Sequence, residues 1–142
     1  MKKIKSVLFV DDDEITSYIN KSIIEEMQIA EKVHCMEDEQ KALEFIIEHC
    51  SGKGAGDDSC PELIFLDVHM PFFNALEFLE LLQQHPGFDA EKLFIVLLTS
   101  SMHDRDKALS QKYKVQAYLN KPLTPEKISH ILFQFFNRRG RI

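Results

Sequence analysis

Val7-Leu8-Phe9-Val10-Asp11-Asp12 and Leu63-Ile64-Phe65-Leu66-Asp67 decide the fold, because each is a short apolar run that ends in aspartate. An unbroken apolar run of this length is typical of a strand that is buried on both faces. Strands of that kind belong to parallel sheets whose faces are covered by helices. The two stretches therefore predict a parallel sheet with carboxylates at the carboxyl ends of two strands.

Two further strand-like runs end in polar side chains. The run at 93–98 leads into Thr99, and the run at 116–120 leads into Lys121-Pro122. In an open parallel sheet, ligands bind outside the carboxyl ends of the strands. We therefore expect the aspartates, the threonine hydroxyl and the lysine at one site, where they suit a divalent cation together with a phosphoryl group.

Strand-like and helix-like segments alternate along the chain. The predicted strands are 3–10, 32–35, 62–66, 93–98 and 115–119. The predicted helices are 15–27, 39–49, 75–84, 104–112 and a last one that begins at Thr124. This alternation implies parallel pairing with right-handed crossovers, so that helices cover both faces of the sheet. The prediction is a doubly wound α/β fold with five parallel strands, forming one domain over 1–142 with its core at about 3–138 and no output domain.

Apolar spacing predicts the buried faces of the first and last helices. In the first helix this face comprises Ile15, Tyr18, Ile19, Ile23 and Met27. In the last helix it comprises Ile128, Ile131, Leu132, Phe135 and Phe136. Asp13 is expected to cap the first helix, and Thr124, followed by Pro125, is expected to cap the last.

Composition excludes several classes of function. The chain has 142 residues, a net charge of −6 and 44% hydrophobic residues, which fits a folded globular domain. That charge argues against general nucleic-acid binding, and the basic stretch 138–141 is interpreted as a frayed end. No stretch approaches the roughly 18 apolar residues of a membrane span, and no export signal is credible. We expect a cytoplasmic protein without membrane insertion.

The three cysteines, Cys35, Cys50 and Cys60, show no metal-binding spacing. Their odd number favours free or buried thiols in a reducing compartment. The glycine-containing segment 51–61 is expected to be an exposed loop.

Taken in order, four stretches make the chain resemble the receiver domain of bacterial response regulators. They are Val10-Asp11-Asp12, Leu66-Asp67-Val68-His69-Met70-Pro71, Leu98-Thr99-Ser100 and Tyr118-Leu119-Asn120-Lys121-Pro122. The resemblance extends over essentially the whole chain. It implies a flavodoxin-like fold with strand order 2-1-3-4-5.

The resemblance also implies the chemistry of the site. Asp67 would be the phosphoacceptor, and a carboxylate is able to hold a phosphoryl group as a mixed anhydride. Asp11, Asp12 and Asp67, with the backbone carbonyl of His69, would hold Mg²⁺ or Mn²⁺. Lys121 would contact the phosphoryl oxygens, and the Lys-Pro step would be cis.

A switch pair and two tuning positions follow from the same resemblance. Thr99 would turn towards the phosphoryl group while the ring of Tyr118 moves inward behind it. His69 and Ser101 would occupy variable positions that set the lifetime of the phosphoryl group. The chain departs from the family at Pro71-Phe72-Phe73-Asn74-Ala75, where two usual glycines are missing, and this puts the shape of that loop in doubt.

The expected function is that of a stand-alone response regulator rather than an enzyme. A histidine kinase or a phosphotransfer protein would donate the phosphoryl group, and a downstream target protein would bind the phosphorylated form. The protein would be a monomer or a weak dimer without direct nucleic-acid contacts. Two alternatives stay open: a phosphorylation-independent scaffold, and a phosphatase that uses Asp11 as nucleophile and Asp13 as acid and base.

Overall fold

The computed structural model describes residues 3–50, 60–67, 75–85, 93–99 and 115–139. The strands are β1 (Ile4–Val10), β2 (Ala30–Met36), β3 (Leu63–Asp67), β4 (Phe94–Thr99) and β5 (Ala117–Asn120). The helices are α1 (Glu14–Met27), α2 (Glu39–Cys50), α3 (Ala75–Gln84) and α5 (Pro125–Arg139). The helix predicted at 104–112 lies outside the described residues.

The five strands form one sheet in the order β2-β1-β3-β4-β5. Every pair of neighbouring strands is parallel. The predicted fold class and strand order are therefore confirmed. The main difference lies at β2, which is longer than the predicted 32–35. The prediction was too short because β2 is an edge strand and lacks the continuous apolar run that marks the central strands.

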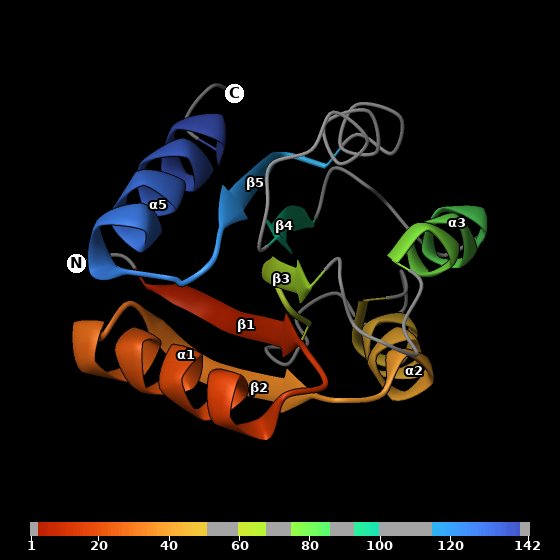
Figure 1. The fold of residues 1–142 in the computed structure, drawn as a ribbon. Helices are drawn as coiled ribbons and strands as arrows, with labels where there is room; N and C mark the ends of the chain where they lie inside the picture. The colour runs from red at the N-terminus through yellow and green to blue at the C-terminus, as the bar shows by residue number, and fades with distance from the viewer. Residues whose placement is uncertain (1–2, 51–59, 68–74, 86–92, 100–114, 140–142) are drawn as a thin grey trace.

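A hydrophobic core lies on each face of the sheet. α2 and α3 pack on one face, over side chains that include Leu66 and Leu97. α1 and α5 pack on the other face, over side chains that include Phe65 and Val96. Figure 1 shows these two pairs of helices on opposite sides of the sheet. Consecutive residues of one strand thus enter different cores, which explains why the central strands have no polar interruption.

The buried face of α1 differs from the prediction. Ile15, Tyr18 and Ile19 are 72%, 73% and 51% exposed, whereas Ser17 and Asn20 are buried. The Sγ of Cys35 on β2 donates a hydrogen bond of 3.7 Å to the carbonyl of Ser17, so the first turns of α1 lie close to the strand. Small side chains fit this close approach, and the large apolar ones are turned outward. The prediction holds only for the second half of the helix, where Ile23 and Met27 pack against the core together with the buried Ile24.

The predicted helix caps are confirmed. The carboxylate of Asp13 accepts hydrogen bonds from the N–H of Ile15 at 3.0 Å and from the hydroxyl of Thr16 at 2.7 Å. The hydroxyl of Thr124 accepts a bond of 3.2 Å from the N–H of Lys127 at the start of α5. The predicted apolar face of α5 is buried or packed against the core in full.

The cysteine prediction was wrong for two of the three residues. Cys50, at the end of α2, and Cys60, just before β3, form a disulfide. Only Cys35 carries a free thiol among the three. Spacing along the sequence says nothing about which segment ends meet, and here the fold brings the two Cα atoms to 5.0 Å. None of the helices described is long and apolar enough to cross a membrane.

Candidate functional site

The predicted polar residues meet at the carboxyl edge of the sheet. Asp67 is the last residue of β3, and Asp11 follows Val10, the residue of β1 that pairs with Leu66. Thr99 ends β4 opposite Asn120, which directly precedes Lys121. Because the strands are parallel and adjacent, their ends deliver these side chains to one place. The structure brings the three aspartates and Lys121 together and places Thr99 at the same edge of the sheet.

Three carboxylates form the acidic part of the site. Asp11 and Asp67 are only 2% and 3% exposed, whereas Asp12 is exposed. One oxygen of each carboxylate lies within 4.8 Å of the corresponding oxygens of the other two. Two carboxylates buried this deeply need a nearby positive charge, because an isolated buried charge is strongly unfavourable.

Lys121 supplies part of that positive charge. Its Nζ lies 2.8 Å from Oδ2 of Asp67 and 3.8 Å from Oδ2 of Asp11. The backbone N–H of Lys121 donates a hydrogen bond of 2.7 Å to the carbonyl of Thr99, which continues the pairing of β4 with β5. The predicted cis peptide bond between Lys121 and Pro122 is confirmed.

A second lysine, which sequence reasoning missed, fixes the turn that carries Lys121. The Nζ of Lys127 donates hydrogen bonds to the carbonyls of Asn120 at 2.8 Å and Pro122 at 2.9 Å. Lys127 lies in the first turn of α5, where a cation is disfavoured by the helix dipole. That unfavourable placement is the signal in the sequence that could have identified it.

The surroundings of Asp11 disfavour its ionised form. Burial, reinforced by the negative charges of Asp67 and Asp12, raises the pKa of Asp11 to about 6. Its Oδ1 accepts a hydrogen bond of 2.9 Å from the N–H of Asp13. Its Oδ2 is buried and finds no hydrogen-bond partner in the described part of the chain.

The donor set fits a hard divalent cation. Mg²⁺ and Mn²⁺ prefer carboxylate oxygens, and Mg²⁺ keeps several of its waters. A cation held by Asp11, Asp12 and Asp67 would satisfy the buried Oδ2 of Asp11 and offset the repulsion that raises its pKa. The exposed Asp12 leaves one side of the site open to solvent.

Thr99 and Tyr118 lie on the same face of the sheet. Tyr118 is half-buried, pairs with Leu97 and packs against the core under α2 and α3. Leu97 enters the same core, so alternation along β4 places the fully buried Thr99 on that face as well. The structure thus places the two residues of the predicted switch pair diagonally across neighbouring strands.

Some predicted site residues lie outside the described part of the chain. They are His69, Ser101 and the segment 72–74, so their predicted roles stay predictions. Ala75 begins α3.

Comparison with known proteins agrees with this geometry. The sequence profile described as the response regulator receiver domain matches residues 7–133. Response regulator Rcp1 of Synechocystis sp. is 27% identical over 118 residues, which cover 82% of this chain and 76% of Rcp1.

Two solved structures illustrate the likeness in fold. The crystal structure of a two-component response regulator from Cytophaga hutchinsonii has a TM-score of 0.80 and 28% identity, with 96% of this chain and 99% of that one covered. The crystal structure of the Mn²⁺-bound form of Rcp1 has a TM-score of 0.64 and 24% identity, with coverages of 95% and 89%. With the profile match spanning most of the chain and the acidic cluster at the strand ends, this protein belongs to the response regulator receiver domain family of two-component systems.

Proposed function

We propose that Asp67 accepts a phosphoryl group from a histidine kinase or a histidine phosphotransfer protein, in a reaction that depends on Mg²⁺ or Mn²⁺. One observation carries the proposal: the Nζ of Lys121 lies 2.8 Å from Asp67 inside a cluster of three carboxylates. If Lys121 only formed an ion pair that stabilises the fold, one buried carboxylate would be enough to balance its charge. Here the negative charges outnumber the lysine, as expected of a site built to receive a cation and a phosphoryl group.

The residues of the site divide the chemistry among themselves. An oxygen of Asp67 attacks the phosphorus of the donor's phosphohistidine, the P–N bond breaks, the imidazole leaves and Asp67 becomes an acyl phosphate. The ammonium group of Lys121 would move from the carboxylate to the phosphoryl oxygens, because its flexible side chain reaches both. The hydroxyl of Thr99, at the end of the neighbouring strand, donates to a phosphoryl oxygen. Catalysis here is positioning and charge neutralisation rather than covalent assistance from a second residue.

Asp11, Asp12 and Asp67 would hold the divalent cation, with the backbone carbonyl of His69 as a further ligand by analogy with the family. The cation would neutralise the charge on the phosphoryl oxygens. Support comes from the buried Oδ2 of Asp11, which accepts no hydrogen bond within the described residues, and from the Mn²⁺-bound form of the related Rcp1.

The exposed face of α1 supports a protein as the phosphodonor. Ile15, Tyr18 and Ile19 form an apolar patch on a helix that begins three residues after Asp11. Exposed apolar patches of this kind are typical of protein contacts. A donor that covers the patch would stand beside the carboxyl edge of the sheet, where its phosphohistidine reaches Asp67.

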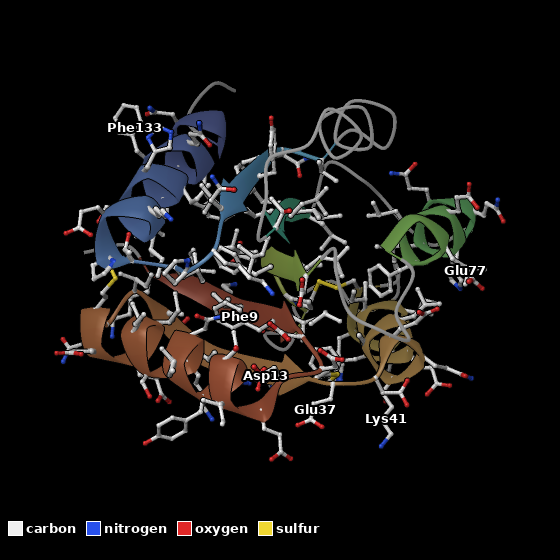
Figure 2. The ribbon with its side chains drawn as sticks, in the orientation of Figure 1. Phe9, Asp13, Glu37, Lys41, Glu77 and Phe133 are labelled. Carbon is white, nitrogen blue, oxygen red and sulfur yellow. A yellow bond between two sulfur atoms is a disulfide. The ribbon has the colours of Figure 1, made fainter. Side chains whose placement is uncertain are left out.

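Signalling to a target protein would follow from a shift between two conformations of the domain. Rotation of Thr99 towards the phosphoryl group would empty space that the ring of Tyr118 can enter. Tyr118 belongs to β5 and Thr99 ends the neighbouring β4. α5 follows β5 in the chain and exposes Phe133, which is 68% exposed and points away from the sheet in Figure 2. We propose that a downstream target protein recognises this part of the surface after phosphorylation.

The two alternative functions predict different behaviour. The carboxylate of Asp13 caps α1 and is exposed, so it is poorly placed to act as the acid and base of a phosphatase. A phosphorylation-independent scaffold would not need Lys121 between two buried carboxylates. The site geometry therefore favours the phosphoacceptor.

Intact mass after incubation with acetyl phosphate tests the proposal. We expect one added phosphoryl group in the wild type with Mg²⁺, and none with a chelator or in Asp67→Asn. Asp13→Asn is the matched control, because it removes a neighbouring carboxylate that lies outside the cluster; it should be phosphorylated like the wild type. Phosphorylation of Asp67→Asn at the wild-type rate would exclude Asp67 as the acceptor.

A further inference from the structure

The disulfide between Cys50 and Cys60 joins the end of α2 to the start of β3, at the opposite end of that strand from Asp67. Cys50 is the last residue of α2, and Cys60 lies just before β3. Figure 2 shows the bond in yellow between α2 and the sheet. The Cα atoms are 5.0 Å apart, which lies within the range that disulfides adopt without backbone movement.

The bond lies at the edge of the sheet opposite the phosphoryl site. β3 runs from Leu63 to Asp67, so Cys60 precedes the strand and Asp67 ends it. The length of β3 alone separates the two by roughly 13 Å. Both sulfur-bearing residues pack against the core under α2 and α3 rather than against the acidic cluster.

The two cysteines are half-buried, so small reagents can reach them. They are separated by ten positions in the sequence. Closure of so short a loop costs less entropy than closure of a longer one, so the second cysteine competes well against any free thiol.

Cys35 provides a contrast within the same chain. Its thiol donates to the carbonyl of Ser17 at 3.7 Å, and burial raises the pKa of this thiol. A thiol with a raised pKa forms little thiolate and exchanges slowly. The fold thus leaves Cys35 as a single free thiol and brings Cys50 and Cys60 close enough to form a bond with each other.

We propose that Cys50 and Cys60 form a reversible thiol–disulfide site that exchanges with small disulfides of the glutathione class and fastens α2 to β3 according to the redox state. In the forward direction, one cysteine thiolate attacks a sulfur of the small disulfide and releases one small thiolate. The second cysteine thiolate then attacks the protein sulfur of the mixed disulfide and releases the other. Two protein thiols are oxidised, the small disulfide is reduced to two thiols, and the two protein protons pass to them.

Counting free thiols tests the exchange directly. The folded protein is equilibrated with reduced and oxidised glutathione at several ratios, quenched with acid, unfolded and alkylated with iodoacetamide. Of the three cysteines, we expect one alkylation under oxidising ratios and three under reducing ratios, with a reversible transition. Cys35→Ser should show no alkylation under oxidising ratios and two alkylations under reducing ratios. Three alkylations, or a stable glutathione adduct, in the oxidised wild type would overturn the proposal.

A second measurement separates the disulfide from the phosphoryl site. Reduction should lower the melting temperature of the wild type by about 8 °C and leave that of Cys50→Ser unchanged, because only the wild type loses a loop constraint. The rate of phosphorylation by acetyl phosphate at low temperature should agree within about twofold between the two redox forms. An equal melting temperature in both forms would refute the fastening role. The alkylation count does not depend on Asp67, so it stands whether or not Asp67 proves to be the phosphoacceptor.

Discussion

Replacing Asp11 by asparagine should stabilise the metal-free protein. The folded structure raises the pKa of Asp11 from 3.8 to about 6, a difference of about 2.2 units. At about 1.36 kcal/mol per unit, ionised Asp11 weakens folding by at most about 3 kcal/mol at neutral pH. Asparagine removes the charge and keeps an oxygen that can accept the N–H of Asp13. We expect a gain of about 2 kcal/mol in the free energy of unfolding, or about 6 °C in melting temperature.

The difference in stability between the wild type and Asp11→Asn should depend on pH. Because the pKa of Asp11 is raised in the folded state, its contribution is most favourable below 3.8 and is lost as the pH rises through about 6. The melting temperature of the wild type relative to Asp11→Asn should therefore increase as the pH is lowered from 7.5 to 5. Both proteins are compared by calorimetry in the presence of a chelator.

Magnesium and a neighbouring variant provide the controls. Mg²⁺ should stabilise the wild type and stabilise Asp11→Asn much less, because one ligand is missing. Asp12→Asn removes the same charge from an exposed side chain, so its metal-free stability should stay within about 0.5 kcal/mol of the wild type. If Asp11→Asn were no more stable than Asp12→Asn without metal, the burial argument would be refuted.

Three further predictions concern other parts of the structure. Lys127→Met should lower the free energy of unfolding by about 1–2 kcal/mol, measured by urea denaturation, because two backbone carbonyls lose their donor. Burial, with the charge of Lys32 beside it, lowers the pKa of His34, so the wild type should lose stability relative to His34→Phe as the pH falls through about 6.5; equal pH profiles would contradict this. Tyr18→Ala should slow transfer from a phosphorylated histidine phosphotransfer protein about tenfold and leave phosphorylation by acetyl phosphate unchanged; an equal loss with both donors would contradict the docking role.

The sequence predicted the sheet and the acidic cluster because their signals are local. An apolar strand such as 63–66 that ends in a single aspartate has few explanations other than a site at the sheet edge. Periodicity failed on α1 because it counts which residues are apolar, whereas Ser17 is buried by the close approach of the helix to β2. The disulfide of Cys50 and Cys60 depends on which segment ends meet in space, and spacing along the chain does not contain that information.

Lys127 connects the site to a surface that lies outside it. Its two hydrogen bonds fasten the turn around Lys121 to the first turn of α5. A protein that shifts α5 would therefore pull on the turn and change how easily Lys121 leaves Asp67 for a phosphoryl group. Thermodynamic linkage makes the effect reciprocal: whatever phosphorylation does to the affinity for that protein, the bound protein does to the stability of the phosphorylated state. A target that prefers the phosphorylated form is thus expected to shift the phosphotransfer equilibrium towards that form.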